Sequence, residues 1–264
     1  MANEIAAAKN TEVSAELLDA MFEDAGAGAS FSADEMQIPF IRLLQALSPQ
    51  LNKKKAEYIE GASAGDAFNN VTAQYWDGEK GLVVLPCYHT IKYLEFTPRE
   101  MGGGFRGEIP VNSPMLNQTT RSGSKEILPS GNELVKSMQY FCFVIDEEDR
   151  SYQPAVIDFK STQLKVAKRW NTQINMQKLT SPDGRTVQAP LFGNLWRLRS
   201  VEESNDQGSW SNWAVELVGK VSDMSLYTEA KNFSKSIEAG EVKAAPENDE
   251  QSSSRYEADS DIPF

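Results

Sequence analysis

The sequence predicts a mainly β fold with flanking helices, of the α+β class, within residues 37–237. Two observations predict it. From residue 68 onward, short apolar runs alternate with Gly, Asp and Pro turn signals, which is typical of strands. Two other segments carry apolar residues at the three-to-four-residue spacing of amphipathic helices. A chain of 264 residues with 40% apolar content has enough material for one sizeable domain.

Charge divides the chain into three regions. Residues 1–36 hold eight acids and one base, and residues 238–264 hold eight acids and two bases. The body, residues 37–237, has 22 acids and 23 bases, although the whole chain carries −12. We therefore expect a flexible acidic N-terminal arm, a globular body, and a disordered acidic tail that is too polar to offset its ordering entropy. A near-neutral body permits a local basic groove.

The first elements are expected in the arm and at the entrance to the body. A short helical stripe in the arm is formed by Leu17, Leu18, Met21 and Phe22. Residues 38–47 are apolar and predict a short buried helix or strand, and both alternatives stay open. Residues 71–76, the turn Asp77-Gly78 and residues 81–96 predict a hairpin with a long second arm.

The second half of the body predicts two more hairpins and two helices. Residues 139–145 and 152–159 pair across the acidic turn 146–150, and residues 192–201 and 210–221 form the last strands. The side chains expected to point inward from the final strand are Trp213, Val215, Leu217 and Val221. Between the hairpins lies a helix with Ser161 as its N-cap, and its buried stripe consists of Leu164, Ala167, Trp170 and Ile174. A last helix, residues 224–237, ends before Gly240.

Counted from Gly81, the order is three strands, a helix and two strands. This is the order of an OB-fold, a partly open five-stranded barrel whose face and loops bind oligonucleotides. Residues 97–136 then form a long inserted loop between the first two barrel strands. Forty residues are too many for a passive connection, so this segment is either a functional flap or contains a further strand.

The residues needed for an enzyme are missing from the sequence. His89 is the one histidine, and its place in an apolar run favours an edge or core-lining role. No Cys/His spacing suits zinc, and the acidic run 146–149 reads as a solvated turn. The glycine-rich segment 102–107 lacks the ending of a phosphate-binding loop. We expect no catalytic residues, no cofactor and no metal.

The expected compartment is the reducing cytoplasm. Cys87 and Cys142 both lie in apolar runs, where Cys behaves as a small hydrophobic residue, so no disulfide framework is implied. The first residues lack the pattern of a secretory signal, and no stretch is long enough to span a bilayer. No membrane partner is therefore expected.

Binding a single strand needs cations for phosphates and flat side chains for bases. Lys165, Lys168 and Arg169 share the basic face of the predicted helix, and Arg197 and Arg199 share one face of a strand. Lys92 lies on the same face of its strand as other polar and aromatic residues. The complete set of candidate DNA-binding residues is Trp76, Lys92, Phe105, Arg106, Lys165, Lys168, Arg169, Arg197 and Arg199.

The tryptophans are expected to divide between core and surface. Trp76 and Trp210 are expected to be exposed, the first of them at a hairpin tip. The expected core tryptophans are Trp170, Trp196 and Trp213. The connection 202–206 between the last two strands is acidic, which argues against a phosphate contact there and favours a DNA path along the flap and the helix.

The last six residues have the clearest functional pattern in the chain. An aromatic residue follows a Pro that keeps Ile262 extended, beside two acids and at the end of a polar segment. The matching residues are Asp259, Asp261, Ile262, Pro263 and Phe264. This ending resembles the acidic C-terminal tip of single-stranded DNA-binding proteins of bacteria and their phages, although Ser260 stands where those proteins usually have Asp.

The resemblance implies a function. In that family the tip recruits replication, recombination and repair proteins and can cover the DNA groove as a phosphate mimic. Residues 38–49 and 65–96 also resemble uncharacterised tailed-phage proteins. We therefore expect a non-enzymatic, phage-encoded protein of the host cytoplasm that coats single-stranded DNA, with a homo-oligomer compatible with the sequence.

Two alternatives stay open. One is an adaptor or inhibitor that uses the tip to occupy the pocket of a host protein without binding DNA. The other is a nuclease or annealing factor that uses the acidic hairpin with a metal.

Overall fold

The computed structural model describes residues 14–24, 27–28, 37–206, 208–242 and 244. The chain divides into two compact units, Met1–Met36 and Gln37–Phe264. The first unit contains α1 (Ala15–Glu23), whose N-cap Ser14 accepts a hydrogen bond from the Leu17 backbone N–H. None of the helix's residues is buried, so its predicted apolar stripe is exposed: Leu17, Leu18, Met21 and Phe22.

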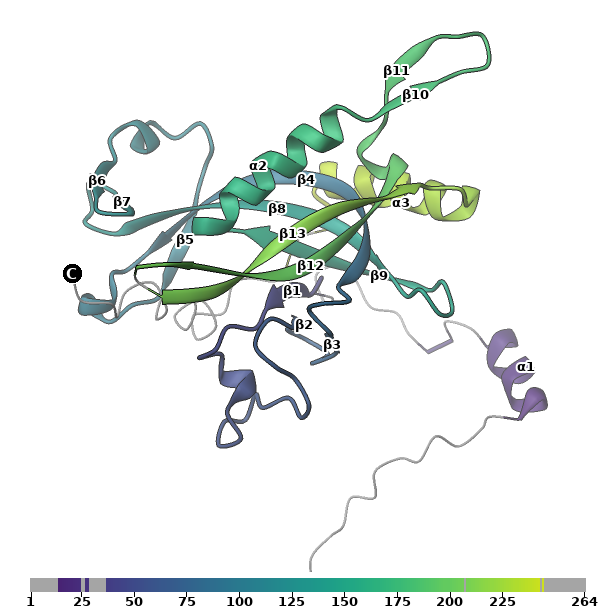
Figure 1. Cartoon of the computed structure of the whole chain (residues 1–264), viewed down its shortest axis with the longest axis horizontal. Helices are drawn as coiled ribbons and strands as arrows, with labels where there is room; N and C mark the ends of the chain where they lie inside the picture. Colours follow the sequence, from purple (N-terminus) through teal and green to yellow (C-terminus); the bar gives the residue numbers. More distant parts are fainter. Residues whose placement is uncertain (1–13, 25–26, 29–36, 207, 243, 245–264) are drawn as a thin grey trace, which may run out of the picture. The chain divides into compact units, whose positions relative to one another are not determined.

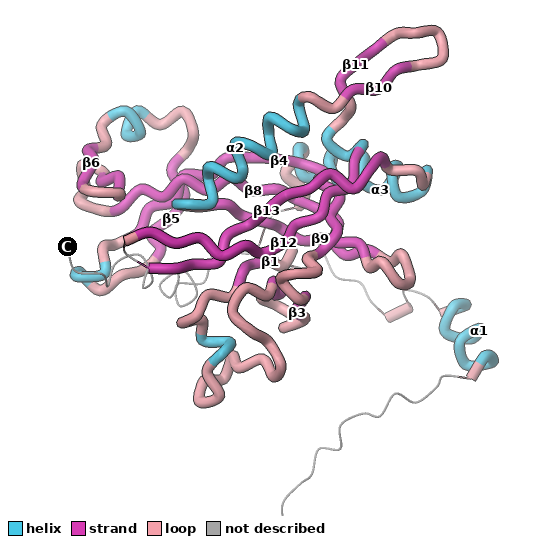
Figure 2. Tube along the Cα trace, viewed as in Figure 1, coloured by secondary structure: helices cyan, strands magenta, loops and turns pink. Residues whose placement is uncertain are grey.

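The second unit is mainly β, with α2 (Leu164–Asn175) and α3 (Met224–Glu238) packed against a large sheet (Figures 1 and 2). Its strands are β1 (Phe40–Leu43), β2 (Ala67–Asn69), β3 (Tyr75–Trp76), β4 (Leu82–Phe96), β5 (Phe105–Ile109), β6 (Thr120–Ser122), β7 (Lys125–Ile127), β8 (Glu133–Ile145), β9 (Tyr152–Phe159), β10 (Lys178–Thr180), β11 (Thr186–Gln188), β12 (Asn194–Asn205) and β13 (Gly208–Lys220). Short 3-10 turns are η1 (Pro49–Leu51), η2 (Arg99–Met101), η3 (Pro114–Asn117), η4 (Ser161–Gln163) and η5 (Leu191–Gly193).

The main path of the sheet runs β13-β12-β4-β8-β9-β1-β2-β3. It curls into a half-barrel (Figure 1). Neighbours along the path are antiparallel except β1 and β9, which are parallel with Phe40 opposite Val156. β10 and β11 form a separate hairpin that projects from the body at the end of α2 (Figure 1).

The two helices of the body cover opposite faces of the sheet. On the α2 face the core contains Trp170, stacked on Tyr140 with ring centroids 4.3 Å apart, together with Trp196. On the α3 face Phe233 stacks on Phe143 at 4.9 Å. Alternate residues of β8 therefore enter different cores, which explains why this strand is apolar almost throughout.

Several sequence predictions are confirmed. The β8–β9 hairpin pairs from Ile145 and Tyr152 to Met138 and Phe159, and β12 pairs with β13. The ambiguous segment at 38–47 contains the strand β1, and α3 spans the predicted last helix. All three tryptophans expected in the core are buried: Trp170, Trp196 and Trp213.

Other predictions are wrong. β3 pairs with β2 rather than with β4, because β4 already has β8, β12 and β5 as partners. Ser161 is not the cap of α2; it lies inside η4 with φ at +48°, and that turn begins the helix. Leu217 does not point into the core but is 42% exposed, because β13 is an edge strand with a register shift beside it.

The long insertion contains strands. β5 folds back on β4, and β6 and β7 form a short hairpin that joins the start of β8. Residues of this insertion build a small core of their own with Tyr93 at its margin, formed by Ile109, Leu116, Leu128 and Leu134. We call residues 97–132 the flap.

Candidate nucleic-acid interface

Three of the predicted DNA-binding residues lie on or beside the β4–β5 hairpin. The Nζ of Lys92 is 2.6 Å from Glu108 Oε2, so an acidic neighbour compensates its charge. The ring of Phe105 packs on Phe96 with centroids 5.5 Å apart. Arg106 is exposed, and its Nε donates to Thr97 Oγ1 at 2.7 Å. The hairpin therefore offers one exposed guanidinium, one paired lysine and a half-buried ring.

The basic face of α2 is formed as predicted, since Lys165, Lys168 and Arg169 are all exposed. Lys165 pairs with Glu203 on β12, Nζ to Oε2 2.8 Å. Burial pushes the pKa of Glu203 upward, but hydrogen bonds from Lys165 and Asn212 outweigh it, and the pKa lies below its ordinary value. In the described part of the chain, Lys168 and Arg169 have no carboxylate partner and can accept an external anion at no cost in ion pairs.

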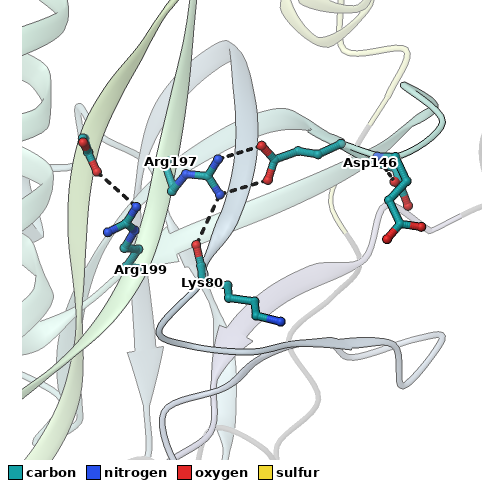
Figure 3. Close-up of polar contacts among 7 residues, drawn as sticks. Lys80, Asp146, Arg197 and Arg199 are labelled. Carbon is teal, nitrogen blue, oxygen red and sulfur yellow. Dashed lines mark hydrogen bonds and ion pairs between the residues drawn. The ribbon is translucent and has the colours of Figure 1, made fainter.

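Arg197 and Arg199 lie together on the face of β12 opposite Trp196, as predicted (Figure 3). The guanidinium of Arg197 binds both carboxylate oxygens of Glu147 at 2.7 and 2.9 Å and also donates to the Lys80 carbonyl. These bonds lower the pKa of Glu147 and raise that of Arg197. Arg199 makes a longer contact of 3.6 Å with Glu216.

The predicted cations do not all lie together. Arg197 is opposite Val83 at the start of β4, whereas Lys92 is near the end of that strand. Nine residues of strand separate them by up to about 30 Å. The β12 arginines and the β4–β5 hairpin are therefore distinct patches.

Trp76 is not at an exposed hairpin tip. It lies in β3, is half-buried and packs against the main core, because β2 and β3 fold onto the end of the sheet. Trp210 is also only half-exposed and lines a cleft of about 730 Å³ between the β2–β3 segment and the β12–β13 hairpin. Four carboxylates line that cleft: Asp66, Asp77, Glu79 and Glu202. This lining would repel phosphates.

The sequence interpretation missed a cation and ring on the α2 face of the sheet. Tyr93 on β4 is directly opposite Lys136 on β8, whose Nζ lies 5.8 Å from the ring centroid. Four residues away along β4 and on the same face, His89 lies against Tyr140 with ring centroids 4.7 Å apart. Alternation along β4 places Tyr93 and His89 on one face and Lys92 on the other, and the sequence-based prediction used only the Lys92 face. Lys136 was not considered because it lies in the predicted insertion.

A second missed feature is a set of buried charges on the α3 face. Lys160 Nζ is 3.0 Å from Asp158 Oδ2, and both side chains are buried. Arg42 on β1, also buried, lies over the ring of Phe40 at 5.1 Å. Ionised groups are buried in proteins when they are paired, so these residues belong to the internal structure of the body.

The acidic hairpin between β8 and β9 is a turn built from its own carboxylates. Asp146 and Asp149 accept backbone N–H bonds from Glu148 and Ser151, and Glu147 is held by Arg197. Across the residues that the structure describes, no group of three or more His, Cys, Asp or Glu side chains could hold a metal ion. The predicted partner-binding residues, Asp259, Asp261, Ile262, Pro263 and Phe264, lie outside the described residues.

Comparison with known proteins places the chain in a phage family. A family model described as Pam3 phage gp34-like protein matches residues 8–243, so the match includes most of the arm and the whole body. Comparisons with curated proteins and with solved structures gave no match. Among the described helices, none has the length and apolarity required to cross a bilayer. The phage affiliation agrees with the sequence prediction, and the chain belongs to the Pam3 phage gp34-like protein family.

Proposed function

We propose that this protein binds single-stranded DNA in the bacterial host cytoplasm, coats exposed strands, and recruits replication, recombination or repair proteins through residues 259–264. The observation that carries the proposal is the strand order of the body. The five long strands lie in the order β13-β12-β4-β8-β9, and α2 connects β9 to β12. The recruiting role rests on the resemblance of residues 259–264 to the tips described above.

This strand order supports an OB-fold. Numbered along the chain, the five strands lie side by side as five, four, one, two, three, with a helix between the third and fourth, as in OB-fold barrels that bind oligonucleotides. The gap between β9 and β13 is occupied by β1, which pairs with β9. Next to β1, the Gln45 side chain exchanges two hydrogen bonds with the Ser211 backbone of β13, at 2.9 and 3.0 Å.

The ion pairs indicate how DNA would be held. Exposed ion pairs contribute about 0–1 kcal/mol each, so phosphates can replace the carboxylates of Glu108 or Glu203 at little cost. Lys168, Arg169 and Arg106 need no such exchange. We therefore expect the basic face of α2 and the β4–β5 hairpin to provide most of the electrostatic affinity for DNA. The acidic cleft beside Trp210 should provide none.

A polarisation titration with labelled oligonucleotides tests the proposal. The expected result is tighter binding to a single strand than to a duplex, with affinity that falls steeply between low and moderate salt. Lys168→Gln/Arg169→Gln should weaken binding and reduce the salt slope by about 1–2, since each removed phosphate contact lowers the slope by roughly 0.7–1. The matched control, Lys178→Gln/Arg185→Gln, changes two exposed cations of the projecting β10–β11 hairpin and should bind as the unmodified protein does. Equal affinity for both oligonucleotides, or no binding in dilute buffer, would exclude the proposal.

The alternative is an adaptor or inhibitor that occupies a host pocket and never contacts DNA. The ion pairs of Lys92, Lys165 and Arg197 favour this alternative. A surface that binds phosphates has no need of carboxylates beside its cations, because those carboxylates compete with the phosphates. Failure of the titration above, together with loss of a host-protein complex when residues 259–264 are removed, would establish this alternative.

A further inference from the structure

We propose that Tyr93, Lys136 and His89 form a nucleotide-contact site on the α2 face of the β4–β8 pair, in which the Tyr93 ring stacks on a base and Lys136 holds the adjacent phosphate. This inference rests on the proposed function and specifies where the strand lies. None of the three residues belongs to the set predicted from the sequence to bind DNA.

The site is fixed by strand register. Tyr93 and Lys136 are an opposed pair, and so are His89 and Tyr140. Side chains of opposed residues lie on the same face of a sheet, and so do residues two apart along a strand, which places all four on one face. This is the face that Tyr140 shares with α2, since its hydroxyl lies 2.7 Å from Asn171 Oδ1.

Neighbouring structures border the site on two sides. Tyr93 packs against Ile109 and Leu128 at the edge of the flap core, and this contact holds the ring in place from one side. At the other end, α2 covers Tyr140. Between them Tyr93, Lys136 and His89 are each half-buried, with the Nε2 atom of His89 itself buried. An aromatic ring held rigidly in this way loses little entropy when a base stacks on it.

The Lys136 ammonium at this site makes no ion pair with the nearby Glu95, which instead accepts hydrogen bonds from Ser130 and Asn132. Lys92, on the opposite face of β4, pairs with Glu108, whereas Lys136 pairs with no carboxylate among the described residues. Burial and the nearby Lys136 ammonium together lower the pKa of His89. The Lys136 ammonium beside the ring, rather than the shift at His89, is what favours an anion at this position.

A flat ring beside an unpaired cation fits a nucleotide, because each nucleotide of a single strand presents a base next to a phosphate. An acidic peptide would satisfy Lys136 but would not need the ring. Substitutions of the ring and of the ammonium therefore separate the two ligand classes.

The test uses the full chain and a labelled single-stranded oligonucleotide. Tyr93→Leu should weaken binding about tenfold without changing the salt slope, since stacking is worth about 1–3 kcal/mol per base and displaces no counterion. Tyr93→Phe should retain the affinity within about twofold because the ring is kept. Lys136→Gln should lower the salt slope by about 0.7–1. Lys231→Gln, an exposed lysine on α3, is the charge control and should change neither quantity.

A second measurement does not depend on the variants folding. Photocrosslinking of an iodouracil-substituted strand to the unmodified protein should label the tryptic peptide 93–99.

If the protein binds single strands but Tyr93→Leu and Lys136→Gln bind as tightly, with the same salt slope, this site is wrong and the proposed function stands. If the unmodified protein does not bind single strands, both fall. Equal losses in Tyr93→Phe and Tyr93→Leu would also overturn the stacking role.

Discussion

At the scale of single residues, Gly81 holds the start of β4 against β12. Its φ is +70°, and a Cβ there would lie 2.2 Å from the carbonyl oxygen of Leu198. The close approach of the two backbones requires that this position have no side chain. It also allows β12 to pair with the first residues of β4, which closes one side of the half-barrel.

We expect Gly81→Ala to destabilise the protein strongly, because an Ala there suffers both an unfavourable φ and a clash with backbone atoms. Gly102→Ala is the matched control, since Gly102 also has a positive φ, +102°, but has no atom within 4 Å of a built Cβ. The left-handed conformation alone costs about 1–2 kcal/mol. Urea denaturation should therefore show a larger loss for Gly81→Ala than for Gly102→Ala, and equal losses would contradict the close approach.

His89 offers a clean pH measurement because it is the one histidine in the chain. Burial first, and then the Lys136 charge, hold its pKa below the ordinary value of 6.5. Its ring packs on that of Tyr140, and the Lys136 ammonium is the charged group that acts on it. Since the unfolded state then binds the proton more readily, stability should decline as the pH falls below 6.5 through the folded-state pKa.

An NMR titration of the His89 ring should give a pKa below 6.5, and a bound oligonucleotide should raise that pKa by bringing a phosphate near. His89→Gln should remove this part of the pH dependence of unfolding. A pKa at or above 6.5 in the free protein would show that Lys136 and burial do not dominate at this site.

At the scale of elements, α2 packs against the main core of the half-barrel. Its Trp170 is fully buried, stacks on Tyr140, and meets Trp196 edge-on at 6.1 Å. The helix thereby joins β8 to β12, two strands that are not neighbours in the sheet.

Trp170→Ala should destabilise the protein by about 3–5 kcal/mol, the usual cost of removing a large buried aromatic side chain. The comparison is Leu217→Ala on the edge strand β13, which is 42% exposed and should cost much less. Urea midpoints of the two variants measure the difference. A small effect of Trp170→Ala would mean that the cavity collapses and that α2 is not a rigid base for its basic face.

Periodicity predicted the elements whose partners lie close in the sequence. The stripe with Ala167 and Trp170 gave α2, and the apolar runs on either side of the acidic turn gave β8 and β9. The pairing of β3 with β2 was not predictable, because local pattern does not show that β4 already has three partners. The short strands β5, β6 and β7 were anticipated only as the alternative that the insertion contains a further strand, and they could not be located because their glycines and polar residues resemble those of a loop.

The candidate site shows the same limit. Sequence spacing correctly gave the exposed basic face of α2 and the shared face of Arg197 and Arg199. It did not give Glu147 as the partner of Arg197, because that contact joins residues 50 positions apart. Nor could it pair Tyr93 with Lys136, which requires the register of two long strands.

At the scale of the whole molecule, acidity is concentrated outside the body. If residues 247–264 act as a competing anion, a chain that lacks them should bind single-stranded DNA as tightly or more tightly and should lose its protein partners. Removal of eighteen mainly polar residues should leave the unfolding midpoint unchanged, which serves as the control. Weaker DNA binding by the shortened chain in a polarisation titration would contradict the competing role.

The body begins and ends at one place. Ile38 forms a parallel bridge with Ala244, and both pack with Phe40 and Ile237 in the core beneath α3. The covalent connections to residues 1–37 and 245–264 therefore leave from adjacent points. A short linker could therefore join these two points and make the body circular. New termini could then be opened between Pro182 and Asp183, in the turn of the projecting β10–β11 hairpin, where no strand of the half-barrel is interrupted.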